Sequence, residues 1–234
     1  MKNIYVFLLL LLPLVTACRA GEQQKLKPVW SDEFEYSGLP DPQKWNYEEG
    51  MIRNGEAQYY TRSRLENARV ENGELVITAR KETFQDASYT SASINTKGLF
   101  EFQGGRVEVR ARLPRGRGVW PAIWTLGTNI NEVGWPVCGE IDIMEFVGYE
   151  PGVVYANVHT GDYNHTKGTG RGGRIQTDSP FDDFHIYAVE WYADRMDFYF
   201  DDQKYFTCDR KGEGSGEWPF DAPQYLLINL AIGG

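Results

Sequence analysis

The stretch CGEIDIMEF at residues 138–146 places three carboxylates, Glu140, Asp142 and Glu145, in an otherwise apolar run. A buried carboxylate is unfavourable unless something compensates for its lost hydration. Two carboxyls on one face can act as an ionised nucleophile and a protonated acid in glycosidic bond cleavage. A third acid between them can hydrogen-bond the nucleophile and add negative field. The alternatives are an acidic surface patch or a calcium site, which normally draws its ligands from a turn-rich loop.

The apolar residues between the acids favour a β-strand, in which residues two apart share a face. Glu140 and the aspartate then point one way, while Ile141 and Ile143 point into the core. Glu145 lies five positions from Glu140 and would point inward in a regular strand. A one-residue β-bulge near Ile143–Met144 would restore its orientation. The two glutamates would then lie roughly 13 Å apart at Cα, and their carboxyls could approach roughly 5 Å, the separation of a retaining glycosidase.

Alternating apolar and polar residues recur along the chain and predict strands at 74–80, 106–113, 153–160 and 196–200. In the third of these segments we expect Val154, Ala156 and Val158 inside, with Tyr155, Asn157 and His159 outside. Turn residues separate the segments, which is typical of an antiparallel β-sandwich. The predicted fold is therefore all-β, with one domain over residues 28–234.

A glycine-rich run at residues 161–174 is predicted to be a surface loop. It does not end in the GK[ST] sequence that a phosphate-binding loop requires.

The first 17 residues are predicted to be an export signal. Lys2 provides the positive start, and the apolar stretch from Ile4 to Val15 is shorter than the roughly 20 residues that cross a bilayer. The sequence Val15-Thr16-Ala17-Cys18 resembles a bacterial lipobox, with Cys18 as the lipidated residue; the alternative is an ordinary signal peptide. Residues 18–27 are then a polar tether. We expect an exported bacterial lipoprotein in the periplasm or at the cell surface.

The formal net charge of −9 argues against nucleic acid and anionic lipid as partners. A neutral substrate fits better, with membrane contact only through the lipid anchor, and we expect a monomer. Export would permit a disulfide between Cys138 and Cys208 but does not require one.

The carboxylate run and several further stretches resemble glycoside hydrolase family 16, and more closely its bacterial laminarinase branch. The family carries E-[IL]-D-x-x-E on a central strand, which here reads EIDIME at 140–145, and the extra Met resembles the laminarinase form. The other similar stretches are WSDEF at 30–34, RNGEAQYYT at 53–61, INTKGLFEFQGGRVEVRARLP at 94–114, GVWPAIWTLG at 118–127, GWPVCGEIDIMEFVG at 134–148 and LINLAIGG at 227–234.

The resemblance implies a β-jelly-roll sandwich (concanavalin A-like) whose concave sheet carries the active-site cleft. It implies Glu140 as nucleophile, Asp142 as its partner and Glu145 as acid/base. Trp124 and Trp135 would stack on glucose rings, and Asn54 would hydrogen-bond sugar hydroxyls. The remaining cleft positions that it implies are Trp120, His159 and Asn229. No cofactor is required for this chemistry, although Glu33 matches a structural calcium site of many relatives.

Two departures from the family pattern stand out. Ser93 replaces an arginine that laminarinases commonly have, which affects the finer sugar contacts. The chain stops at Gly234, where relatives continue into a further strand; the sequence therefore predicts a truncated, poorly stable domain.

The leading interpretation is an endo-acting β-1,3-glucanase, with mixed β-1,3/1,4-glucan as a further substrate. A hydrolase of an algal galactan such as agarose is the alternative within the fold. A non-catalytic glycan-binding surface lipoprotein is the alternative of another class, but a binder has no need of three clustered acids.

Replacement of Cys18 by Ser is expected to release the protein from the membrane or leave it unprocessed, because two acyl chains hold where one is marginal. Labelled fatty acid and membrane fractionation measure this directly. A wild-type protein that is fully soluble and carries no lipid label would contradict the lipobox interpretation.

Overall fold

The computed structural model describes residues 26–178 and 180–234. The predicted export signal at 1–17 and Cys18 lie outside the described residues, as does the tether up to residue 25. Contacts divide the chain into a unit ending at Ser31 and a unit spanning Asp32–Gly234, and the second unit forms the fold below. Among the described residues, no helix is both long enough and apolar enough to cross a membrane.

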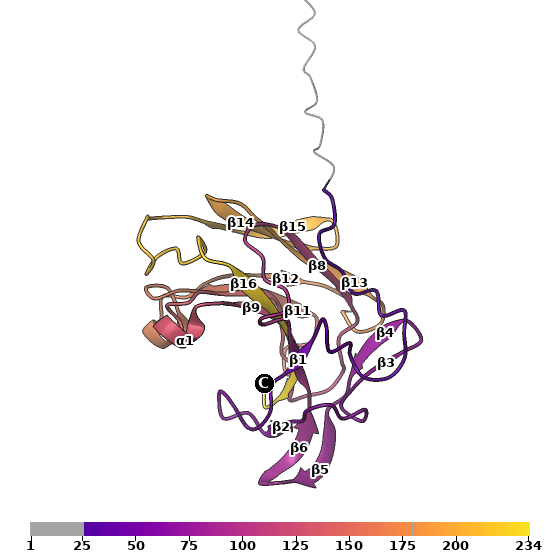
Figure 1. Cartoon of the computed structure of the whole chain (residues 1–234). Coiled ribbons are helices and arrows are strands. Elements are labelled where there is room, and N and C mark those ends of the chain that lie inside the picture. The colour runs from indigo at the N-terminus through magenta and orange to yellow at the C-terminus, as the bar shows by residue number, and fades with distance from the viewer. Residues whose placement is uncertain (1–25, 179) are drawn as a thin grey trace, which may run out of the picture. The chain divides into compact units, whose positions relative to one another are not determined.

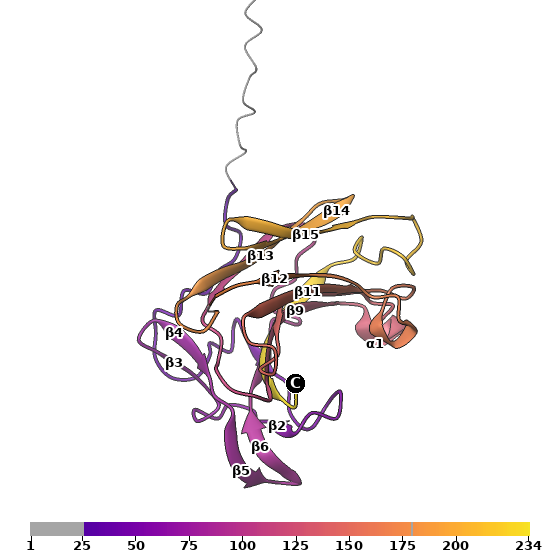
Figure 2. The same ribbon diagram turned by 180° about the vertical axis from the view of Figure 1, so that it is seen from behind.

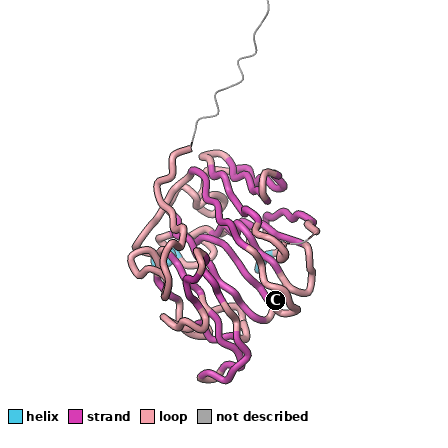
Figure 3. Tube along the Cα trace, turned by 90° about the vertical axis from the view of Figure 1, so that its right-hand side faces the viewer, coloured by secondary structure: helices cyan, strands magenta, loops and turns pink. Residues whose placement is uncertain are grey.

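The second unit is built of strands joined by loops, with very little helix (Figure 3). The strands are β1 Asn46–Tyr47, β2 Gln58–Tyr60, β3 Ala68–Glu71, β4 Glu74–Ile77, β5 Arg80–Phe84, β6 Ala87–Ser91, β7 Ser93–Asn95, β8 Gly105–Ala111, β9 Val119–Gly127, β10 Glu140–Phe146, β11 Val153–His159, β12 Arg171–Gln176, β13 His185–Trp191, β14 Arg195–Phe200, β15 Gln203–Asp209 and β16 Gln224–Ile232. The helical segments are short, namely α1 Ile130–Val133 and the 3-10 turn η1 His165–Lys167.

Two sheets stack as layers of a sandwich (Figures 1 and 2). One has seven strands in the order β1-β7-β16-β9-β10-β11-β12, and the other has four in the order β15-β14-β13-β8. Neighbours within both sheets are antiparallel. The smaller sheets β2-β6-β5 and β3-β4 complete the unit. The predicted antiparallel β-sandwich is confirmed.

Alternation along the strands separates a core face from an outer face, as predicted for β11. Val154, Ala156 and Val158 are at most 1% exposed, whereas Tyr155, Asn157 and His159 line a cleft. Aromatic and aliphatic residues of the four-stranded sheet, such as Tyr187 and Phe198, are fully buried. Burial of each such side chain contributes roughly 1.5–3 kcal/mol to folding, so the core stabilises the sandwich on which the cleft lies.

The expected β-bulge is present in β10. Asp142 pairs with Trp124 and the next pair on the same ladder is Met144 with Ile123, so one extra residue is absorbed on β10. Glu140 pairs with Leu126 and Glu145 with Ala122, only four positions apart on β9. All three acids consequently face the same side, while Ile141 and Ile143 are fully buried.

The loop prediction for residues 161–174 was partly wrong. Residues 171–176 form the edge strand β12, which pairs along β11 from Val153 to Val158. Glycine is depleted in strands and obscures their alternation. Here, however, a glycine is required, because a Cβ at Gly173 would lie 2.5 Å from the Phe206 side chain.

Deletion of Met144 is expected to remove the bulge and leave the cleft arrangement intact. The two glutamates would then be four residues apart, which gives them the same orientation in a regular strand. Met144 is 1% exposed, so the variant should lose roughly 1.5–3 kcal/mol of stability and keep measurable amounts of the glucan hydrolysis that the family resemblance implies.

Deletion of Ile141 is the matched control, because Glu140 and Asp142 become neighbours in the chain and would then point to opposite faces of the strand. Thermal melts and hydrolysis rates compare the two variants. Complete inactivity of a well-folded Met144 deletion would show that the bulge does more than set side-chain direction.

Candidate active site

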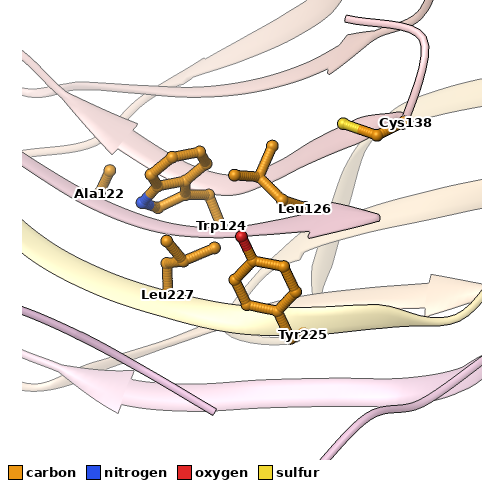
Figure 4. Packing of buried hydrophobic residues seen from close by; sticks show 6 residues of the cluster. All are labelled: Ala122, Trp124, Leu126, Cys138, Tyr225 and Leu227. Carbon is orange, nitrogen blue, oxygen red and sulfur yellow. The ribbon is translucent and has the colours of Figure 1, made fainter. Parts of the chain in front are cut away.

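A cleft of about 1490 Å³ crosses the outer face of the seven-stranded sheet. Its floor contains a cluster of buried side chains, Ala122, Trp124, Leu126, Cys138, Tyr225 and Leu227 (Figure 4). Every cleft residue that the sequence predicted lines it: Asn54, Trp120, Trp124, Trp135, Glu140, Asp142, Glu145, His159 and Asn229. Glu33 is not among the lining residues and is exposed.

Glu140 lies at the start of β10, where Trp135 and His159 approach its carboxyl. The indole Nε1–H of Trp135 donates to Glu140 Oε2 over 2.8 Å. His159 Nε2 lies 3.7 Å from Glu140 Oε1. Burial and the nearby charge of Asp142 raise the pKa of Glu140, and His159 partly opposes this shift.

Asp142 is the most buried of the three acids, with 3% of its surface exposed. His159 Nε2 lies 3.3 Å from its Oδ2, and carboxyl oxygens of Asp142 and Glu140 lie within 4.8 Å of each other. Burial, followed by the charge of Glu145, raises the pKa of Asp142 well above its usual value. When two adjacent carboxyls both resist ionisation, the state in which the pair keeps one proton is favoured over the state in which both are ionised.

Glu145 is held at both carboxyl oxygens. Trp120 Nε1–H donates to Oε1 over 3.1 Å, and Asn157 Nδ2 donates to Oε2 over 2.6 Å. Asn157 faces Gly172 on β12, where a Cβ would lie 2.1 Å from Asn157 Oδ1. Because Gly172 has no Cβ, the Asn157 side chain has room to reach Glu145.

The remaining predicted residues form a polar network in the floor. Trp124 Nε1–H donates to Asn229 Oδ1 over 2.7 Å, and Asn229 Nδ2 donates to the Tyr60 hydroxyl over 2.9 Å. Asn54 Nδ2 donates to Glu56 Oε1 over 3.2 Å. Asn229 and Asn54 are thus positioned by other side chains.

Sequence reasoning missed Asn157 as a site residue, although its place in the alternating pattern puts it beside His159 on the cleft face. It also missed Arg53 and Glu48, which line the cleft from a loop and from the residue after β1. No periodic pattern marks these two, because the loop takes its path from tertiary contacts.

Glu140, Asp142 and His159 each offer one ligand atom, and these atoms lie within 4.8 Å of one another. Among the described residues this is the one group of His, Cys, Asp and Glu with such spacing. The set combines carboxylate and imidazole ligands, which suit a transition metal better than calcium. Within residues 26–178 and 180–234 no corresponding group gathers around Glu33, and calcium binding there stays a prediction.

Two carboxyls on one face of a β-sandwich cleft, each hydrogen-bonded to an indole, define a glycosidase that acts on extended sugar chains. The chain belongs to glycosyl hydrolases family 16, whose family model matches residues 55–234.

Individual relatives agree with this assignment. A β-glucanase of Rhodothermus marinus is 50% identical over 215 residues, covering 88% of this chain and 75% of the relative. The X-ray structure of the laminarinase from Rhodothermus marinus superposes with a TM-score of 0.86 at 48% identity, covering 88% of this chain and 86% of that chain. SCLam, a non-specific endo-β-1,3(4)-glucanase co-crystallised with 1,3-β-D-cellotriosyl-glucose, has a TM-score of 0.85 at 43% identity, covering 89% and 84%.

Replacement of Asp142 by Asn is expected to raise the melting temperature more at pH 7 than at pH 4. A carboxyl whose folded pKa is raised stabilises the fold below its unfolded pKa of about 3.9. That stabilisation is lost as the pH rises toward the folded value, whereas the amide stays neutral throughout. Each kcal/mol recovered at pH 7 should raise the melting temperature by about 2–4 °C, measured by calorimetry.

The control is Asp197→Asn, which should behave in the opposite way. Burial opposes the shift, but hydrogen bonds from Thr207 and Arg195 lower the pKa of Asp197. This carboxylate stabilises the fold above its unfolded pKa, and the contribution is lost as the pH falls through the folded value. Its replacement should lower the melting temperature at pH 7. Equal shifts of Asp142→Asn at both pH values would contradict the burial argument.

Proposed function

We propose that the protein is a retaining endo-β-1,3-glucanase that also accepts mixed β-1,3/1,4-glucan. The observation that carries the proposal is the pair of glutamates on one face of β10, four ladder positions apart and held by separate donors. Four strand steps correspond to roughly 13 Å between Cα atoms, which lets the side chains converge on one glycosidic bond. The β-glucanase and laminarinase relatives support β-glucan as the substrate.

Endo-action follows from the way the cleft crosses the sheet. Besides loop residues, its lining includes side chains from the five neighbouring strands β16, β9, β10, β11 and β12. At about 4.8 Å between strands, the groove spans roughly 19 Å. A groove of this length binds an internal segment of a polysaccharide, with the acids in its middle strand.

Glu140 acts as the nucleophile in this mechanism. Its carboxylate attacks the anomeric carbon while the glycosidic C–O bond breaks, which forms a glycosyl ester. Glu140 and Asp142 hold one proton between them. In this mechanism the proton resides on Asp142, which is more deeply buried than Glu140. The Trp135 N–H and His159 meanwhile favour the ionised form of Glu140.

Glu145 acts as acid and then as base. It gives its proton to the departing glycosidic oxygen, and in the second half it takes a proton from the water that attacks the ester. Trp120 and Asn157 fix its carboxyl at both oxygens during this exchange. The product keeps the anomeric configuration of the substrate.

Sugar binding is assigned to the residues around these acids. Trp135 is 38% exposed, which leaves ring surface for stacking, and Asn54, His159 and Asn229 offer hydrogen bonds. The three converging acids also disfavour a pure glycan-binding role. An agarose-type galactan remains the alternative substrate.

Three further properties belong to the proposal. They are attachment to the membrane through lipid on Cys18 after export, a monomeric state, and a structural calcium ion near Glu33. No metal is needed for the chemistry described, because carboxyls supply both the nucleophile and the proton.

Reducing-sugar release from laminarin, lichenan, agarose and carrageenan tests the substrate assignment. We expect rapid cleavage of laminarin to oligosaccharides, slower cleavage of lichenan, and none of the galactans. NMR of the earliest products should show retained anomers. Cleavage of agarose without cleavage of laminarin would replace the proposal by its alternative.

Glu140→Gln should reduce laminarin hydrolysis at least about 10⁴-fold, because an amide is a poor nucleophile. Glu145→Gln should be similarly slow on laminarin but should accumulate a glycosyl ester from an aryl glucoside whose leaving group needs no proton. Asp142→Asn should keep weak activity. Mass spectrometry of the intact protein detects the ester, and its appearance on the Glu140→Gln variant would refute the assignment of roles.

A further inference from the structure

The aromatic face of Trp124 is covered, although this residue was expected to stack on sugar. Its side chain is only 7% exposed. The guanidinium carbon of Arg53 lies over the indole, 4.9 Å from the ring centroid, a typical cation–π contact. The edge of the indole is engaged as well, since Nε1–H donates to Asn229. A pyranose ring needs a free aromatic face, so Trp124 offers no platform in this arrangement.

Arg53 is anchored in this position by the polar groups beneath it. Its Nη2 forms an ion pair with Glu48 Oε2, and the Ser93 hydroxyl donates to the same oxygen over 2.5 Å. The side chain of Arg53 is 20% exposed. Burial opposes ionisation, but Glu48 raises the pKa of Arg53 overall, so the group stays a cation at neutral pH. Moving it would separate a partly buried ion pair, which is unfavourable.

The tryptophan on the other side of the acids is arranged differently. Trp135 is 38% exposed; the nearest aromatic ring to it is that of His165, at 5.2 Å with the planes tilted by 38°. No guanidinium lies over it within the described part of the chain. Of these two indoles, that of Trp135 is thus open to sugar and that of Trp124 is closed by a cation.

We propose that Arg53 is a specificity-determining residue that removes the Trp124 platform from the cleft. The proposal rests on the β-glucanase function proposed above and concerns how that same cleft holds its substrate. Glucan binding then relies on Trp135 and on hydrogen bonds near Asn54, while the sugar nearest Trp124 is held weakly. An open platform at this position would increase affinity for longer oligosaccharides.

Binding of laminarihexaose by isothermal calorimetry tests the proposal, with Glu140→Gln in every variant to prevent turnover. The test variant adds Arg53→Ala and Glu48→Gln, so that no partly buried carboxylate is left without its cation. The matched control carries Glu48→Gln alone and keeps Arg53. A second test variant, Arg53→Lys with Glu48 intact, keeps the charge but lacks the planar group that covers the indole. Thermal melts establish that each variant is folded.

The Arg53→Ala, Glu48→Gln variant should bind laminarihexaose about threefold to tenfold more tightly than its control. The same comparison with a trisaccharide should show a smaller gain. Adding Trp124→Leu should abolish the gain, because the exposed ring is its source.

Equal or weaker binding of both Arg53 variants would overturn the proposal, since the guanidinium would then be neutral toward sugar or contact it directly. A gain that survives Trp124→Leu would overturn it too. If the Glu140→Gln parent fails to bind laminarihexaose, the proposed function fails and this inference falls with it. Binding by the parent without a gain from the Arg53 variants refutes the inference alone.

Discussion

The extra residue in β10 is the constraint on which the cleft depends. The core needs Ile141 and Ile143 beneath the sheet, and a regular ladder would then place Glu145 beneath it as well. An ionised carboxylate in that core would cost several kcal/mol after relaxation. The bulge removes this conflict by letting Met144 oppose Ile123, so that the core and the cleft are both satisfied by one strand.

The electrostatics of the cleft follow from that placement. Three acids on one strand face repel one another, and the surrounding N–H groups of Trp135, Trp120 and Asn157 compensate two of them. The acid between them is compensated least, because it is nearly enclosed and the basic group beside it is the imidazole of His159. Its raised pKa is therefore a product of position. The cleft is a site where stability is given up to hold a proton next to the proposed nucleophile.

Much of this arrangement could be predicted from the sequence, because parity in a strand is a local property. The alternation of residues along each strand predicted that Glu140, Trp124 and Asn229 face the cleft. The bulge was predicted because Glu145 lies an odd number of positions from Glu140. Loops carry no such periodicity, so Arg53 was not recognised as the cover of Trp124. The glycines of β12 hid a strand for a related reason: their role depends on what stands opposite them, and the sequence alone does not contain that information.

The position of β16 has a consequence for the order in which the molecule can be assembled during synthesis. This strand lies between β7 and β9 and pairs with both, although on the order of 100 residues separate it from β9 along the chain. Translation at about 5–20 residues per second leaves a delay of roughly 5–20 s between the two. Throughout that interval β9 has an unpaired edge and the floor of the cleft does not exist. A ribosome-bound chain therefore carries all three acids well before it has the groove that could bring a glucan to them.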